Sequence, residues 1–207
     1  MAPTKHLDPI QAGVQITRDN LQWGTTLGTA YGPITYGFRL TSTTGSSTER
    51  TTFSKVNAAE MAAVEDAMRL WSNVAHVTFT EVNPGGYTNS ATILIANYSS
   101  SSDGAAAYAY YPGSTGFTSS AGDVWINAYY QSNLSPSPGN YAYMAVLHEI
   151  GHTLGLEHPG NYNAGPGVTI TYDKNAEYVE DSRQYAVMSY FDASATGVEY
   201  RPEASVV

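Results

Sequence analysis

The 207-residue sequence contains no cysteine. Disulfides, thiolate zinc sites and cysteine nucleophiles are therefore excluded, and any bound zinc must be held by His, Asp or Glu. Positive charge is scarce, with nine Lys and Arg against eighteen Asp and Glu and a formal net charge of −9. This sign disfavours nucleic acid and anionic membrane surfaces as partners. No apolar run in the sequence approaches the ~20 residues that span a bilayer, so we expect no membrane span.

The overall composition is typical of a folded, exported protein. Charged residues make up only 13%, against about 25% in an average domain, and uncharged polar residues and seventeen Tyr take their place. Hydrophobic residues reach 42% and no repeat of fixed period is present, so a single domain over residues 1–207 is expected. Met1–Gln11 lacks the cationic and apolar regions of a signal peptide, so no export signal is recognised in this chain.

Hydrophobic periodicity predicts an α/β fold around a five-stranded sheet. The expected strands cover residues 34–40, 77–82, 92–97, 105–111 and 123–128. A helix of about 18 residues is expected after Asn57 and Glu60, which resemble a capping box, and a second helix over residues 140–154. A strand, a helix and a strand in succession favour parallel pairing. Beyond Gly155 the chain is rich in loop-forming residues.

The segment from His148 to His158 is the most informative part of the sequence. His148 and His152 are four residues apart on one helical face and can aim their rings at one ion. Glu149 can reach a water molecule there without being a ligand, which is the position of a general base. Gly155 can end the helix and turn the chain so that His158 closes the site. Three imidazoles leave one position open, as in catalytic zinc sites.

Two alternatives to a catalytic site are compatible with this segment. The histidines can match this spacing by coincidence, although the odds from residue frequencies are on the order of one in 10^5. The zinc can also be purely structural, but the open coordination and the additional Glu149 argue against that interpretation.

This segment resembles the zinc signature of metzincins, which a tight turn containing methionine follows. Residues 185–191 contain such a methionine, Met188, and resemble this Met-turn. Pro159, directly after the third histidine, is typical of serralysins rather than of astacins or matrixins. Three further segments are also serralysin-like: residues 15–23, 161–165 and 179–185.

The serralysin resemblance implies a fold and a set of site residues. The fold would be a twisted, mostly parallel five-stranded sheet with one antiparallel edge strand, two long helices and a loop-rich C-terminal subdomain. The upper subdomain would cover about residues 15–158 and the lower about 159–207. The implied roles are zinc ligands for His148, His152 and His158, general base for Glu149, platform for Met188, and switchable fifth ligand and hydrogen-bond donor for Tyr190.

The resemblance also implies that a peptide substrate binds as an extra strand at a sheet edge. The candidate edge is Ala106, Ala107, Tyr108 and Ala109, because small side chains let a peptide backbone approach. The alternative is an ordinary edge strand. The S1′ pocket would be shaped by residues 191–201.

Serralysins continue into a calcium-binding β-roll of Gly-Gly-x-Gly-x-Asp repeats, and this sequence contains none. Calcium is therefore expected only through a family C-terminal domain that this sequence does not include. The acidic residues Asp173, Glu177, Glu180 and Asp181 lack a calcium-binding pattern, so a solvated loop is expected there.

The leading hypothesis is a secreted, extracellular zinc endopeptidase that cleaves proteins or peptides, with type I-like export implied by the resemblance. A monomer is expected, and a proteinaceous inhibitor is a further candidate partner. The alternatives are a non-catalytic secreted binding module with a structural zinc, and an amidase that uses the same metal chemistry.

Overall fold

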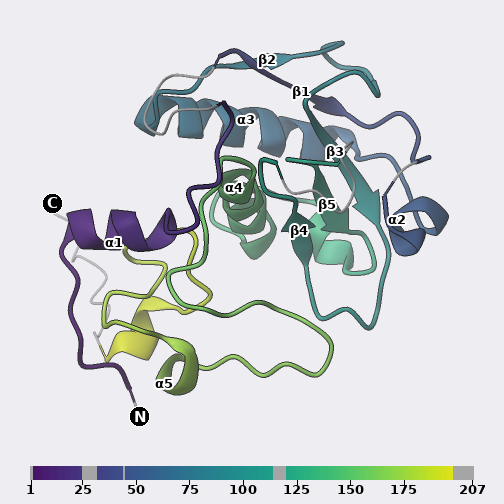
Figure 1. Ribbon diagram of the computed structural model, residues 1–207. Helices are drawn as coiled ribbons and strands as arrows, with labels where there is room; N and C mark the ends of the chain where they lie inside the picture. The colour runs from purple at the N-terminus through teal and green to yellow at the C-terminus, as the bar shows by residue number, and fades with distance from the viewer. Residues whose placement is uncertain (1, 25–31, 44, 114–119, 198–207) are drawn as a thin grey trace, which may run out of the picture. The chain divides into compact units, whose positions relative to one another are not determined.

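The computed structural model describes residues 2–24, 32–43, 45–113 and 120–197 (Figure 1). The chain divides into two compact units, one of residues 19–156 and one of residues 1–18 with 157–207. Within the described residues, no helix combines the length and the apolar character that crossing a membrane requires. The division into upper and lower subdomains remains a prediction.

The larger unit is built on one five-stranded sheet in the order β2-β1-β3-β5-β4. The strands are β1 (Ile34–Phe38), β2 (Phe79–Glu81), β3 (Ile93–Tyr98), β4 (Ala107–Ala109) and β5 (Val124–Asn127). The pairs β1–β2, β1–β3 and β3–β5 are parallel, and β4 is an antiparallel strand at the edge. The predicted fold class, including its single antiparallel edge strand, is confirmed.

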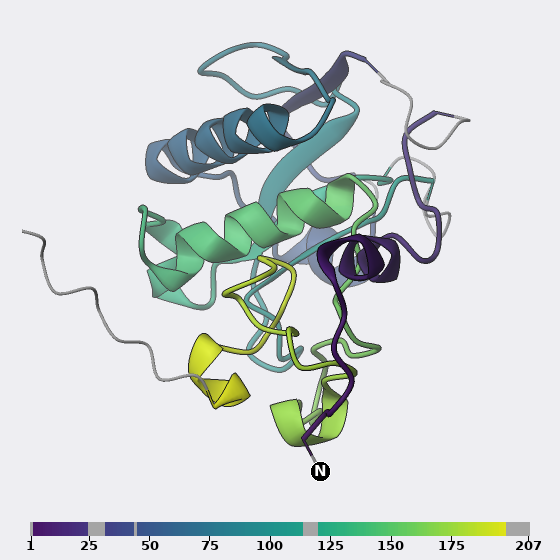
Figure 2. The same ribbon diagram turned by 90° about the vertical axis from the view of Figure 1, so that its left-hand side faces the viewer.

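Two long helices, α3 (Ala58–Val74) and α4 (Tyr141–Thr153), cover one face of this sheet. Side chains from both helices share a hydrophobic core with alternate residues of β1, β3 and β5, and the two helices lie side by side in Figure 2. The opposite face carries a smaller cluster around Trp125 and Tyr98. Because side chains alternate between the two faces of a strand, β3 and β5 supply both clusters.

Local sequence explains where the two helices begin. The side chain of Asn57 accepts hydrogen bonds from two amides of the first turn of α3, and Glu60 closes the predicted capping box. Asn140 caps α4 by accepting from the amide of Tyr143 at 2.9 Å. The indole of Trp71 on α3 donates to the carbonyl of Leu147 on α4 at 3.0 Å, which fixes the two helices against each other.

Four of these five strands are shorter than predicted, whereas β3 keeps its predicted length and is shifted by one residue. Leu40, for example, lies beyond the end of β1 and is 42% exposed. The sequence analysis also missed α2 (Ser47–Thr51), where Ser46 and Glu49 form a capping box within the Gly/Ser/Thr-rich stretch after β1. A short 3-10 helix, η1 (Gln131–Leu134), leads toward α4. The Pro112–Gly122 turn lies partly outside the described residues.

Among its described residues, the smaller unit contains only short helices. These are α1 (Pro9–Ile16), α5 (Tyr172–Asn175) and the 3-10 helix η2 (Ala193–Thr196). The sequence analysis expected an irregular opening, but Asp8 and Gln11 form a capping box and Pro9 occupies the first turn of α1. The core of this unit is an aromatic cluster around Tyr162, Tyr172 and Phe191. The expected loop-rich character of residues after Gly155 agrees with this architecture.

Candidate metal centre

Helix α4 presents three adjoining functional side chains that are all buried. His148, Glu149 and His152 are 5%, 6% and 6% exposed. The rings of His148 and His152 lie edge to face with their centroids 4.7 Å apart, as expected for residues four apart on one helix. The opposite side of α4 carries Val146 and Ile150 into the sheet core. The amphipathic pattern of the helix therefore orients the polar side chains.

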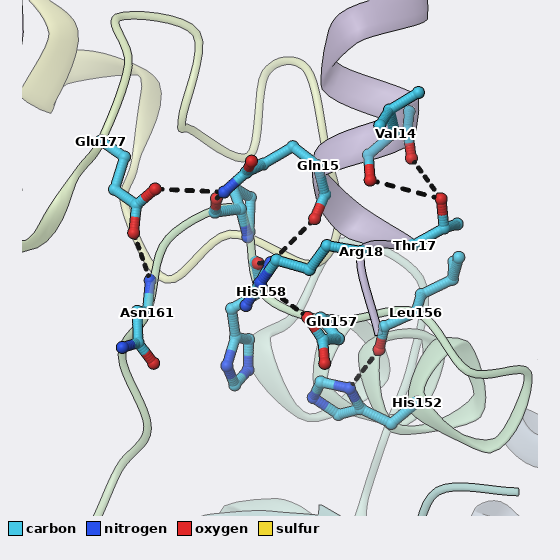
Figure 3. A network of polar contacts seen from close by, with 12 residues as sticks. Val14, Gln15, Thr17, Arg18, His152, Leu156, Glu157, His158, Asn161 and Glu177 are labelled. Atoms are coloured by element: carbon cyan, nitrogen blue, oxygen red, sulfur yellow. Dashed lines mark hydrogen bonds and ion pairs between the residues drawn. The ribbon is translucent and has the colours of Figure 1, made fainter. Parts of the chain in front are cut away.

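The environment of His152 determines which of its nitrogens is available to a metal. Its Nδ1 lies 2.7 Å from the carbonyl oxygen of Leu156 (Figure 3). A carbonyl can only accept, so Nδ1 carries the proton and Nε2 remains as the ligand atom. The ring of Tyr111, two residues beyond β4, lies edge to face against His152 at 5.3 Å.

Gly155 makes the sharp turn after α4, as predicted. Its φ is +93°, and a Cβ at this position would lie only 1.9 Å from the carbonyl oxygen of Leu21. Both the left-handed conformation and the close backbone approach therefore require glycine. The indole of Trp23 donates to the carbonyl of Thr153 at 2.7 Å, so the segment around Leu21 is bound to the end of α4.

His158 completes the histidine group. One potential ligand atom from each of His148, His152 and His158 lies within 4.8 Å of the other two, and all three residues are buried. Imidazole nitrogens are preferred zinc ligands, and three of them leave a fourth position for water or substrate. The donor set therefore fits one catalytic Zn²⁺.

Glu149 is a buried carboxylate with a raised pKa and an oxygen that lacks a hydrogen-bond partner within the described residues. Burial raises its pKa from 4.5 to about 8. Its buried Oε2 has no hydrogen-bond partner within the described residues. A buried carboxylate oxygen without a partner is costly in an unliganded protein, and a water molecule or a nearby cation would relieve that cost.

The segment that carries His158 is irregular and is held by Arg18, the second residue after α1. The guanidinium Nε of Arg18 pairs with Glu157 at 2.8 Å, and its Nη1 donates to the carbonyls of His158 and Gln15, both at 2.8 Å (Figure 3). The amide of Glu157 donates to the carbonyl of Ile16 at 2.8 Å. One arginine thus binds both the backbone of the third histidine and the side chain of the residue before it.

A second set of contacts continues this anchoring. The side-chain amide of Gln15 donates to the carbonyl of Pro159 and to Glu177, both at 3.1 Å. Glu177 accepts from the amide of Asn161 at 3.0 Å, so it bridges two segments in Figure 3. Sequence reasoning missed Arg18, Glu157 and Gln15 as residues that organise the site, because their partners are distant in sequence.

Met188 and Tyr190 lie in the irregular segment that contains the candidate Met-turn. Met188 is 1% exposed. The ring of Tyr190 lies 4.5 Å from that of His158, and the ring of Tyr162 stacks on His158 at 5.2 Å with an interplanar angle of 17°. The predicted neighbours His158 and Tyr190 are thus in contact.

The expectation of a solvated acidic loop was wrong for Asp181. This side chain is fully buried and accepts hydrogen bonds from Tyr162 and Ser189 at 2.9 and 2.7 Å. Glu177 and Glu180 also have specific partners, the latter being His6 and the amide of Leu7. The spacing of these charged residues in the sequence carries no information about their burial.

The candidate substrate strand is at an edge, as predicted. Backbone N–H and C=O groups of alternate residues point toward β5. These residues are Ala106, Tyr108 and Tyr110, which pair with Asn127, Trp125 and Asp123. Backbone groups alternate along a strand, so those of Ala107 and Ala109 point away from β5. The hydroxyls of Tyr108 and Tyr110 donate to the same oxygen of buried Glu49, both at 2.7 Å.

Comparisons with known proteins agree with this geometry. A family model described as Matrixin, peptidase M10, matches residues 46–184. Metallopeptidase AprA of Pseudomonas marginalis is 41% identical over 92% of this chain, and Serralysin A of Dickeya chrysanthemi is 39% identical over the same share. The chain spans 39% of the length of each relative. The solved structure of myroilysin is 20% identical, with a TM-score of 0.40 over 69% of this chain and 54% of its own; a likeness this weak carries no argument.

These matches confirm the predicted resemblance, the enzyme class of the family, zinc metalloendopeptidases, and its single catalytic zinc as cofactor. The relatives named serralysin agree with the indication from Pro159. Since the family model covers most of the chain and the histidine group fits the metal, the chain belongs to peptidase family M10, whose matching model is described as Matrixin, as a metzincin catalytic domain of the serralysin type.

Proposed function

We propose that this chain is a secreted, zinc-dependent endopeptidase that hydrolyses peptide bonds within proteins. The observation that carries the proposal is the group of three buried imidazoles next to a buried glutamate with an unpartnered carboxylate oxygen. Proteins or peptides are the proposed substrates, and the proposed form is an extracellular monomer that a proteinaceous inhibitor can block. The type I-like export route is part of the same proposal.

In this mechanism His148, His152 and His158 hold the metal. Bound Zn²⁺ would lower the pKa of a water molecule toward ~7 and polarise the scissile carbonyl. Glu149 accepts the proton of the attacking water and passes it to the leaving amine. Burial supports this role because the carboxylate, cut off from bulk water, holds protons more tightly than an exposed glutamate does.

Tyr190 is the proposed second catalytic residue. Its hydroxyl would donate a hydrogen bond to the oxyanion that forms on the substrate carbonyl, a contribution of typically ~3 kcal/mol for such a donor. Its ring contact with His158 keeps it beside a metal ligand. The fifth-ligand role of Tyr190 and the platform role of Met188 belong to the same proposal.

The substrate would pair with the open side of β4. Ala107 and Ala109 direct their backbone groups away from β5, so these two residues of the stretch Ala106–Ala109 would make the main-chain hydrogen bonds. The rings of Tyr108 and Tyr110 are held by Glu49, which keeps the strand in place. The contact of Tyr111 with His152 connects the end of this strand to the metal ligands.

Replacing Glu149 tests the proposal most directly. Glu149→Gln keeps the shape of the side chain but removes the proton acceptor, so kcat/KM on casein should fall by roughly 10^3-fold or more. Bound zinc, measured by atomic absorption, should remain at one per chain. Glu81→Gln on β2 is a matched control that should retain full activity. Undiminished cleavage by Glu149→Gln would disprove the mechanism.

Metal removal separates the enzyme from a binding module stapled by zinc. For an enzyme, a chelator should abolish casein cleavage while circular dichroism changes little, because the sheet core does not depend on the metal. Global unfolding on chelation, with no cleavage by the zinc-bound protein, would favour a non-catalytic binding module with a structural zinc. Turnover of small amides but not of oligopeptides would favour an amidase.

A further inference from the structure

Asp181 is a buried carboxylate that the proposed mechanism does not use. It is fully buried in an irregular segment of the smaller unit, where a charge is costly unless specific groups compensate for it. Its Oδ1 accepts two hydroxyl hydrogen bonds, from Tyr162 at 2.9 Å and from Ser189 at 2.7 Å. Both donors adjoin residues of the candidate metal centre, so the partners of Asp181 deserve a functional explanation.

The first donor, Tyr162, supports the third histidine. Its ring is 4% exposed and stacks nearly parallel on the ring of His158, with centroids 5.2 Å apart. A ring held by packing alone can slide in its plane, whereas the hydrogen bond to Asp181 fixes the hydroxyl end of Tyr162. Asp181 therefore sets the surface against which the imidazole of His158 rests.

The second donor, Ser189, lies between Met188 and Tyr190. Its Oγ donates to Asp181 and also accepts from the amide of Phe191 at 3.1 Å, so it closes the turn on the far side of Tyr190. The Tyr190 ring in turn lies 5.2 Å from that of Tyr162 and 4.5 Å from that of His158. One carboxylate oxygen thus connects the support of His158 with the turn that carries Tyr190.

We propose that Asp181 is a positioning residue that, through Tyr162 and Ser189, holds the third zinc ligand and the catalytic tyrosine in register with each other. The proposal rests on the proposed function. In this proposal Tyr162 orients His158 and thereby affects the affinity for zinc. Ser189 orients Tyr190 and thereby affects kcat.

A matched pair of tyrosine variants tests the link from Asp181 through Tyr162 to His158. Tyr162→Phe keeps the ring stacked on His158 but loses the hydrogen bond to Asp181. Tyr172→Phe is the control, because Tyr172 belongs to the same aromatic cluster and loses a comparable bond of 2.8 Å, to the carbonyl of Val179. Zinc affinity is measured by competition with a chromophoric chelator, independently of catalysis. We expect the zinc Kd to rise about 10-fold in Tyr162→Phe, as for outer-shell partners of metal ligands, and to stay unchanged in Tyr172→Phe.

Ser189→Ala, made in the wild-type protein and in a Tyr190→Phe variant, tests the link from Asp181 through Ser189 to Tyr190. In the wild-type protein it should lower kcat about 10-fold while KM changes less than about twofold, because the loss concerns the transition state. In a Tyr190→Phe background it should lower kcat no further, since its effect passes through the missing hydroxyl. Urea unfolding of every variant measures its stability separately. A purely structural effect would lower the free energy of unfolding without the expected differences in zinc Kd and kcat.

The possible failures can be told apart. If the wild-type chain binds no zinc or cleaves no casein, the proposed function itself fails. If it binds and cleaves normally but Tyr162→Phe has the same zinc Kd as Tyr172→Phe, the link to His158 is wrong. An equal loss of kcat from Ser189→Ala in both backgrounds overturns the link to Tyr190.

Discussion

The candidate metal centre draws on two regions that are built in different ways. His148, Glu149 and His152 lie on α4, a capped helix whose own hydrogen bonds and apolar side set their directions. His158 and Tyr190 lie on irregular segments, which side chains from elsewhere in the smaller unit hold by hydrogen bonds and ion pairs. The helix creates its site geometry locally, whereas the irregular segments acquire theirs through partners as far as 140 residues away.

This difference has a consequence for mutational sensitivity. In the helix, only the ligands themselves and the residues that end the helix should strongly affect zinc affinity. In the irregular segments, residues that never touch the metal should also change its affinity, because no regular backbone ladder holds the ligand in place. The following predictions test this contrast.

Removing a ligand should have the largest effect in both regions. His152→Ala and His158→Ala should each raise the zinc Kd by more than about 100-fold, since loss of a ligand should exceed the 10–100-fold cost of losing an outer-shell partner. The exposed His76 provides the control, and His76→Ala should leave the Kd unchanged. Chelator competition measures all three, and retention of wild-type affinity by either ligand variant would remove that histidine from the site.

Gly155→Ala should be the most destabilising change at the end of the helix. The added Cβ would meet the carbonyl of Leu21 at 1.9 Å in a left-handed conformation with φ +93°. We expect a loss of roughly 2–4 kcal/mol in the free energy of unfolding by urea titration. Gly139→Ala is a close control, with φ +92° and nothing within 4 Å of the new Cβ, and should cost only about 1 kcal/mol. Equal costs would show that backbone strain, not the close approach, demands glycine.

Asp181 makes the irregular segments sensitive to pH. Burial raises its pKa from 3.8 to about 6, so between these values the folded protein keeps a proton that the unfolded chain has released. The free energy of unfolding therefore falls as the pH rises through this window. Asp181→Asn can still accept from both hydroxyls, and its stability relative to wild type should grow from about equal near pH 3.5 to about 3 kcal/mol greater above pH 7. Parallel pH dependence of the two proteins in urea titrations would refute this assignment.

Arg18 should have the smallest effect, although it is the clearest test of distant anchoring. Arg18→Ala removes the ion pair with Glu157 and the bond to the carbonyl of His158, and we expect the zinc Kd to rise about 10-fold. Arg18→Lys should recover only part of this loss, because one ammonium cannot reproduce the guanidinium fork. Arg69→Ala is the control, since Arg69 pairs with Asp66 on α3 and should not influence zinc binding. An unchanged zinc Kd in Arg18→Ala would mean that the position of His158 does not depend on the contacts of Arg18.

Much of the fold was predictable because it follows from local patterns. The capping box at Asn57, the apolar side of α4 and the alternation in β1 each act within one element. The first two were confirmed, and the alternation was confirmed as far as Phe38. The helices α1 and α2 were missed because their capping boxes stand beside short segments without a long periodic signal. The S1′ expectation for residues 191–201 stays a prediction, and residues 198–201 lie outside the described part of the chain.

The sequence by itself determined the candidate histidine group, the adjacent glutamate and the glycine that ends α4, because helical periodicity and ligand chemistry restrict these positions within eleven residues. Only the tertiary structure decided that Arg18 fixes the backbone of His158 and that Asp181 is buried under two hydroxyls. The physical reason is that charge, burial and hydrogen-bond partners in irregular segments depend on contacts between distant residues, and residue spacing does not encode those contacts.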